Sequence, residues 1–425
     1  MLSAELIDDV AGLEPWVDAW DRLAVELAQP CGSPHWMLPW WRHAVQGRAE
    51  LRSVVVREGD ELVGLAPYFV QLGSHGLAEY RVLSAGAAHR IGPLAKPGRE
   101  QDVAEAIAET IATARPQPSS FIFEGVDAES RWPALVRDVW PGALGSRLRT
   151  TVVMEAPTLT LSDPDFDTWF GARSSNFRQQ MRRKGRQAEG RGGQIRMARS
   201  EEEASRDLEA MLVYHRDRWA ERGLEGSLKP GIEDQMREAV ARLLPLERAR
   251  LWTIEADGKP VCIQYFTVAG GELTYWGGGF DPEWEDFQPA QLAILEAVKD
   301  AFARGERRVD FGGGDQRYKG RFANGDDPID VSVPSTASLN AETVPRPSPL
   351  CAFETNTWSG LVGRNSLPNG PTPSAANGDP GAGVRRPPRP TVKLSIREVL
   401  IRVPTTFDPS PLKNTWPGCD PSGSA

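Results

Sequence analysis

Hydrophobic positions along this chain recur with two different periods, one typical of helices and one typical of strands. Apolar residues three and four apart predict helices over residues 14–28, 103–114, 132–140, 167–190, 201–222, 232–244 and 289–304, and a buried or helical aromatic segment over 36–41. Short apolar runs between turn residues predict strands over 51–57, 61–70, 120–124, 151–161, 194–198, 249–256, 260–268, 272–277, 308–311 and 328–333. This alternation predicts an α/β protein with mixed sheets.

The same hairpin pattern occurs twice. A strand, a turn with glycine and aspartate, and a second strand follow one another over 51–67 and again over 251–265. Such hairpins are common, so the match alone is weak. Its similar position within each part of the chain favours a duplicated fold, with an N-terminal domain over 1–160 and a second domain over 161–334.

The composition changes at about residue 335. Proline, glycine, serine, threonine and asparagine dominate 335–425. A segment of this kind buries too little apolar surface to offset its chain entropy. We therefore predict a disordered tail, to which we assign no chemistry.

Charge and cysteine usage narrow the class of protein. The net charge of -9 argues against a general DNA binder, because the negatively charged phosphate backbone attracts proteins with an excess of lysine and arginine. The 4 cysteines are scattered and form no metal-ligand spacing, so neither a bound metal nor a disulfide framework is expected. No apolar run approaches the roughly eighteen residues that cross a bilayer. We expect a reduced, cytoplasmic protein without membrane insertion.

The stretch Val309–Phe322 contains the most specific pattern. A predicted strand ends in three glycines, and Asp315, Tyr318 and Lys319 follow. Glycines permit close approach of a ligand or of another backbone. Lys319 could hold a phosphate or an oxyanion, and Tyr318 could relay a proton. The alternative is a tight turn whose cations are solvated.

A second glycine run lies between a predicted strand and a predicted helix. Gly277, Gly278 and Gly279 end the strand, and Gln288 and Ala290 flank the start of the helix. Free N–H groups at a helix N-terminus attract phosphate or carbonyl oxygen. The acidic residues over 281–286 would repel a pyrophosphate, so a purely structural role is an equal alternative.

Two further helices carry candidate groups. The basic stretch 173–191 includes Arg182, Arg183 and Lys184, which could receive an anionic ligand or form a solvated face. His215 lies on the same apolar helical face as Trp219, where histidines are more often structural than catalytic. No Ser-His-Asp arrangement is visible.

The order of these features resembles a known family. A basic helix, the His215–Trp219 helix, three strands, a long helix and the segment 310–322 resemble the CelD/BcsL-like acetyltransferases of the GNAT superfamily, which are similar to the FemAB aminoacyl transferases. The resemblance covers about residues 16–322. It implies two GNAT-like domains in tandem and transfer of an acyl group from acetyl-CoA, as co-substrate, to a small-molecule or saccharide acceptor in polysaccharide or cell-envelope synthesis.

The resemblance also implies roles for residues. In FemAB-like relatives a lysine matching Lys319 assists acyl transfer, and Asp315, Tyr318 and His215 are the candidates for a general base. The usual GNAT pyrophosphate loop is absent, and the acidic segment 281–288 stands in its place. Two alternatives stay open: a FemAB-like transferase that uses aminoacyl-tRNA, and a non-catalytic GNAT-fold binding component.

Overall fold

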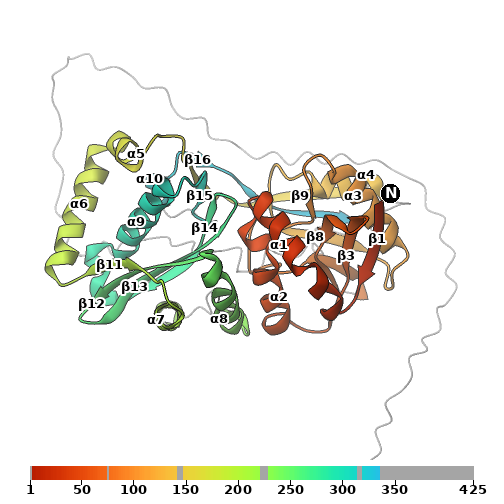
Figure 1. Cartoon of the computed structure of the whole chain (residues 1–425), viewed down its shortest axis with the longest axis horizontal. Helices are drawn as coiled ribbons and strands as arrows, with labels where there is room; N and C mark the ends of the chain where they lie inside the picture. Colours follow the sequence, from red (N-terminus) through yellow and green to blue (C-terminus); the bar gives the residue numbers. More distant parts are fainter. Residues whose placement is uncertain (1, 74–75, 141–146, 221–227, 314–317, 336–425) are drawn as a thin grey trace, which may run out of the picture. The chain divides into compact units, whose positions relative to one another are not determined.

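Two halves with a similar order of elements follow one another in the computed structural model, which describes residues 2–73, 76–140, 147–220, 228–313 and 318–335 (Figure 1). The first contains β1 (Leu2–Ile7), α1 (Val17–Glu26), α2 (Pro34–His43), β3 (Ser53–Glu58), β4 (Glu61–Ala66), β5 (Tyr68–Leu72), β6 (Ala78–Val82), α3 (Glu100–Ala112) and β8 (Ser120–Asp127). The second contains β11 (Gln194–Met197), α7 (Glu201–Ala220), α8 (Ile232–Leu243), β12 (Ala249–Ala256), β13 (Lys259–Ala269), β14 (Glu272–Phe280), α9 (Pro289–Ala303) and β15 (Arg308–Asp310). The predicted duplication is confirmed.

Shorter elements complete the two units. In the first half, residues 2–154, they are the 3-10 helices η1 (Ala11–Trp16) and η2 (Pro30–Gly32), and β2 (Ala49–Leu51), β7 (Leu94–Ala95), α4 (Trp132–Val139) and β9 (Arg147–Met154). In the second half, residues 157–335, they are β10 (Pro157–Thr160), α5 (Phe166–Ala172), α6 (Ser175–Gly190), the 3-10 helices η5 (Leu244–Leu246) and η6 (Pro282–Phe287), α10 (Lys319–Phe322), β16 (Gly325–Asp326) and β17 (Ile329–Ser335).

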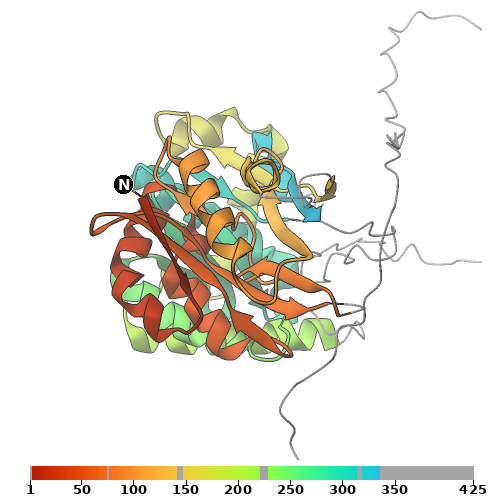
Figure 2. The same cartoon turned by 90° about the vertical axis from the view of Figure 1, so that its right-hand side faces the viewer.

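Each half has one pair of parallel strands within otherwise antiparallel sheets. The first half has the strand orders β1-β3-β4-β7 and β2-β5-β6-β8-β17-β9, and Pro67 separates β4 from β5 where the chain passes between these sheets. The second half has the order β11-β12-β13-β14-β15-β10-β16. The parallel pairs among the described strands are β6 with β8 and β14 with β15. Figure 2 shows the orange helix α3 lying across the red and orange strands of the first half.

The two halves exchange strands. β10, which follows β9 directly, pairs with β15 in the second-half sheet. β17 returns from the second half and lies between β8 and β9, where the blue strand reaches the first half in Figure 1. The single strand predicted over 151–161 is therefore wrong, because β9 and β10 lie in different sheets. The boundary predicted at residue 160 leaves β10 with the first domain and β17 with the second, whereas β10 pairs in the second-half sheet and β17 in the six-stranded sheet of the first half.

Apolar side chains cover both faces of the second-half sheet. One core joins the first half to α7 and α8, and a second core lies between the sheet and α5, α6 and α9 (Figure 1). The helix predicted over 167–190 is broken into α5 and α6, because the Ser174 hydroxyl accepts the N–H of Phe177 at 3.3 Å and begins a new helix.

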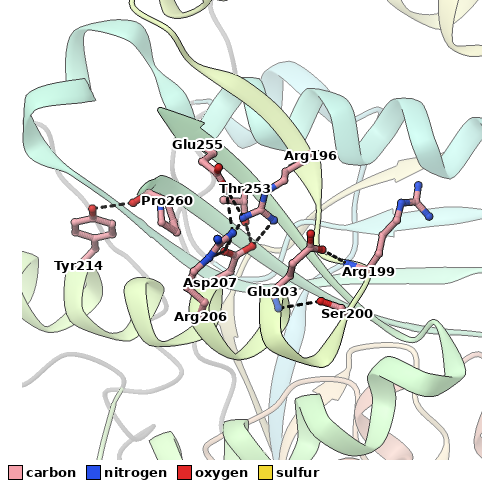
Figure 3. A network of polar contacts seen from close by, with 10 residues as sticks. All are labelled: Arg196, Arg199, Ser200, Glu203, Arg206, Asp207, Tyr214, Thr253, Glu255 and Pro260. Carbon is pink, nitrogen blue, oxygen red and sulfur yellow. Dashed lines mark hydrogen bonds and ion pairs between the residues drawn. The ribbon is translucent and has the colours of Figure 1, made fainter. Parts of the chain in front are cut away.

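A buried ion network fixes α7 to the edge of this sheet (Figure 3). The guanidinium of Arg196, on β11, donates to both carboxylate oxygens of Asp207, on α7, at 2.6 and 2.8 Å. It also donates to Glu255 on β12. Thr253 adds a hydroxyl donor to Asp207 at 2.8 Å, so the fully buried carboxylate is paired and hydrogen-bonded. The network holds α7 against β11 and β12.

Candidate functional site

The parallel strands β14 and β15 separate partway along their length and form a fork. They pair from Glu272 with Arg308 to Thr274 with Asp310, after which β14 continues to Phe280 while β15 ends. A bulge in the pairing of β13 with β14 falls at Trp276. The region between residues 274–276 and residues 311–312 is called the fork below.

A small cavity occupies the fork. It measures about 20 Å³, enough for one water-sized group. Its described lining residues are Cys31, Ala88, His89, Thr274, Tyr275, Trp276, Phe311, Gly312 and Lys319. A larger cavity of about 490 Å³, lined by residues 127–132 and 326–328 among others, shares none of these residues. The small cavity therefore contains the predicted lysine, and both halves contribute to its wall.

Lys319 is a buried group, not a solvated one. Its side chain is 2% exposed, its Nζ donates to the carbonyl of Gly313 at 3.0 Å, and it lies 5.5 Å from the ring centroid of Tyr275. The alternative of a turn with solvated cations is thus wrong for Lys319. Tyr318 is half-buried beside the second core, and Asp315 lies outside the described residues.

Aromatic packing holds the short helix that carries Lys319. The ring of Phe322 packs edge-on against Phe177 at 5.1 Å between centroids and lies 5.8 Å from Phe311. α10 is therefore attached both to α6 and to the strand end that forms one side of the fork. This packing positions α10, and with it Lys319, at the fork. It does not involve Gly277, Gly278 or Gly279.

The three glycines of β14 have different surroundings. A Cβ on Gly278 would overlap the Gln264 side chain, and one on Gly279 would lie 2.7 Å from the carbonyl oxygen of Met211 on α7. A Cβ on Gly277 would meet no described atom within 4 Å. The backbone nitrogen of His215 lies 3.2 Å from the same Cβ position on Gly279, and the buried His215 is not among the described residues that line the cavity. Gly278 and Gly279 are thus explained by packing, whereas Gly277 leaves space beside its backbone.

The N-terminus of α9 is linked to α10 through α6. Gln288 precedes α9 in the left-handed conformation, and Ala290 follows in its first turn. The Gln180 amide on α6 donates to Gln288 Oε1 at 2.8 Å, and Arg321 on α10 donates to Gln180 Oε1 at 2.6 Å. The candidate anion site and the lysine helix are therefore held by one polar chain.

The basic helix α6 also contacts the acidic segment before α9. Lys184 Nζ donates to the carbonyl of Asp286, while Arg191 donates to Glu283 and lies 4.9 Å from the Trp284 ring. Arg182 and Arg183 are exposed, and Arg182 lies over the Phe170 ring at 5.6 Å. The cations of α6 thus offset part of the acidity that the sequence places next to the α9 N-terminus.

The first half completes the fork with a segment that the sequence analysis did not single out. Arg90 Nε donates to Asp310 Oδ2 at 2.5 Å, and the same carboxylate accepts the N–H of Gly312 at 2.8 Å. Burial alone would raise the pKa of Asp310, but Arg90 and the Gly312 N–H outweigh burial and lower it. A charged Asp310 therefore fixes the end of β15.

Two other cavity groups are neutral near pH 7. Burial, opposed by Asp310 and reinforced by Arg90 and Lys319, lowers the pKa of His89 to about 4. Burial raises the pKa of the Cys31 thiol to about 12, against a hydrogen bond with Thr267. Among the described residues no group of three histidine, cysteine, aspartate or glutamate side chains could hold a metal ion, and no described helix is long and apolar enough to cross a membrane.

Comparison with known proteins agrees with this geometry. Residues 175–320 match the family described as acetyltransferase (GNAT) domain. The structure of FemX has 11% sequence identity and a TM-score of 0.53, with 77% of this chain and 96% of FemX covered. A tandem GNAT protein from the clavulanic acid biosynthesis pathway has 16% identity and a TM-score of 0.40, covering 80% of this chain and 100% of that one.

A third structure, L-PGS from Bacillus licheniformis, has 13% identity and a TM-score of 0.43, covering 65% of this chain and 82% of that one. Among these three, FemX is similar enough to show a shared fold, and at this identity it shows the fold alone. No curated protein matches the sequence. Residues 175–320, in the second half, thus resemble a GNAT acetyltransferase domain.

Proposed function

We propose that this protein transfers an acetyl group from acetyl-CoA to an amine or hydroxyl of a small-molecule or saccharide acceptor. The fork between β14 and β15, with buried Lys319 beside it, supports this proposal most strongly. The cavity holds only one water-sized group, so it has no room for a long acyl chain.

The fork suits an extended donor. Pairing of β14 with β15 ends at Thr274, so the backbone of β14 beyond that residue can pair with the amide groups of a pantetheine arm, as an added strand would. The open space beside Gly277 lies along this stretch. The N–H groups at the start of α9, near Gln288 and Ala290, would receive the donor phosphates, with Lys184 of α6 as a nearby cation.

Direct transfer needs few chemical groups. Holding acceptor and thioester together supplies most of the rate enhancement, because a bimolecular step becomes effectively unimolecular. Lys319 Nζ, beside the cavity, would stabilise the negative oxygen of the tetrahedral intermediate. Asp315, Tyr318 and His215 remain the candidate bases; neither Tyr318 nor His215 is among the described residues that line the cavity.

The CelD/BcsL resemblance favours a saccharide acceptor and a role in polysaccharide or cell-envelope synthesis. A second candidate is a FemAB-like transferase that takes its acyl group from aminoacyl-tRNA. The exposed Arg182 and Arg183 on α6 and the fold shared with FemX favour it. Binding of tRNA that weakens steeply with salt, and is lost in an Arg182→Ala/Arg183→Ala variant, would support this second candidate.

Calorimetric titration of the full chain with acetyl-CoA tests the proposal. We expect saturable binding and, with water as the acceptor of the acetyl group, slow release of free thiol that is reduced on the order of 100-fold in Lys319→Met. Lys299→Met is the matched control, because Lys299 is exposed on α9 and pairs only loosely with Glu296 at 3.5 Å. If folded wild-type protein binds no acetyl-CoA, the proposal is wrong and the tRNA-dependent candidate takes its place.

A further inference from the structure

A segment of the first half reaches into the fork of the second half. Trp276 Nε1 donates to the carbonyl of Ala87 at 3.3 Å, and Arg90 binds Asp310 and also contacts Asp127. Arg90 Nη2 donates further to the carbonyl of Asp327 at 3.1 Å. These contacts fix residues 87–90 at both ends of a short turn, with His89 between them.

His89 therefore has a fixed place in the cavity wall, on the same small cavity as Lys319. The titratable groups that act on it are Arg90 beside it in the chain, Asp310 at the end of β15 and Lys319 on α10, while Cys31 of η2 lines the same cavity. Their combined effect with burial keeps the imidazole neutral at neutral pH. A neutral imidazole has one ring N–H donor and one acceptor nitrogen.

We propose that His89 donates its ring N–H to the carbonyl oxygen of the bound acyl group and, with Lys319, stabilises the oxyanion of the transfer reaction. This proposal rests on the acyltransferase function proposed above. It makes the active site composite, with one oxyanion donor from each half of the molecule. A neutral imidazole suits the task, because it polarises a carbonyl without giving up its proton.

The reaction balances without a change in the protonation of His89. The acceptor lone pair forms the new bond to the carbonyl carbon, and the π electrons move to the oxygen held by His89 and Lys319. Collapse of this intermediate re-forms the carbonyl and breaks the carbon–sulfur bond, so the thiolate leaves with the electron pair. The proton released by the acceptor nitrogen or oxygen passes through water to the thiolate.

Infrared difference spectroscopy of the full chain with carbonyl-¹³C-labelled acetyl-CoA tests this role. An N–H donor lowers the carbonyl stretching frequency, so the bound thioester should absorb below the free one. His89→Phe, which fills the space without a donor, should shift the band back toward the free value. His89→Gln, which keeps an N–H, should give a band between those of wild type and His89→Phe. His43→Gln on α2 is the matched control, because His43 is exposed and its Nε2 pairs with Glu238 at 2.7 Å.

Kinetics complete the test. We expect thiol release to fall on the order of 100-fold in His89→Phe, with partial rescue in His89→Gln and acetyl-CoA affinity unchanged within about 3-fold. Bound acetyl-CoA with the same carbonyl band in wild type, His89→Phe and His89→Gln would overturn the role of His89 and leave the proposed function standing. Absence of acetyl-CoA binding by wild type would overturn both.

Discussion

The two parallel strand pairs of this molecule occupy the same position in their halves but differ at the point where each pair ends. In the first half the last pair is Arg81 with Ile122, and β8 continues as far as Asp127 against β17. In the second half the last pair is Thr274 with Asp310, and β15 stops while β14 continues. In the first half the strand after the connecting helix, β8, is the one that continues, with β17 on its other edge. In the second half the strand before the connecting helix, β14, continues past a cavity that Lys319 lines.

Side-chain chemistry follows this difference. The region around β6 and β8 is filled by an aromatic cluster in which Phe121 packs against Tyr68, Tyr80 and Trp140. The fork of the second half is instead lined by groups that can donate hydrogen bonds. The equivalent region is therefore filled by aromatic side chains in the first half and contains the candidate site in the second half. The first half contributes His89 and Arg90 to that site.

The largest effect is expected from removing the charge at the fork. Asp310→Asn leaves the buried Arg90 guanidinium with a weaker partner, so the free energy of unfolding should fall by about 3 kcal/mol. Chemical denaturation measures it. Asp102→Asn, in an exposed pair with Arg99, should cost much less because solvent screens that pair. Equal losses in the two variants would show that Asp310 does not anchor the fork.

The next effect concerns Glu272, which lies at the start of the pairing between β14 and β15 and whose burial makes stability depend on pH. Burial, against attraction from Arg308, raises the pKa of Glu272 to about 8, above the unfolded value of 4.5. The native state then binds more protons than the unfolded chain between these values, so stability falls as pH rises from about 5 to 8.

Glu272→Gln removes this proton linkage. We expect the variant to gain stability relative to wild type on the order of 2 kcal/mol between pH 5 and pH 8, measured by urea unfolding at both values. Stability curves of variant and wild type that run parallel with pH would contradict the interpretation.

A matched pair of glycine substitutions tests whether β14 packs or binds at each position. Gly279→Ala places a methyl group against the α7 backbone and should cost about 1–3 kcal/mol of stability. Gly277→Ala enters open space, so stability should change by less than about 0.5 kcal/mol while acetyl-CoA affinity falls. Thermal unfolding and calorimetry measure the two effects, and an unchanged affinity in Gly277→Ala would place the donor elsewhere.

The smallest effect concerns the basic helix. Lys184→Met should weaken acetyl-CoA binding by about 3-fold at low salt and by less at high salt, because the cation is partly exposed and screened. Arg304→Met, at the opposite end of α9, is the control. A loss that does not depend on salt would argue against an electrostatic role for Lys184.

Local sequence patterns predicted elements that carry their own signals and missed elements that depend on distant partners. α9 runs over Pro289–Ala303, within one residue of its prediction, because its apolar stripe and first-turn proline are both local signals. β6, with polar residues between its apolar ones, and β1, in an acidic segment, were not predicted. Their strand form depends on partners from distant parts of the sheet.

The site shows the same limit. Lys319 could be predicted because glycines and a strand end precede it. Arg90 could not, because its partner Asp310 lies 220 positions away and no local pattern connects them. His89 reaches the cavity through the same long-range contact, and the exchange of β10 and β17 likewise has no signal within either strand.

Hydrogen exchange of the full chain with and without acetyl-CoA tests the central claim most directly. The account predicts slower amide exchange over residues 275–292 and 308–322, at the open fork and the α9 N-terminus, and unchanged exchange over 78–82 and 120–127 in the first half. Protection centred on β6 and β8, or no protection at saturating acetyl-CoA, would contradict the assignment of the site to the second-half fork.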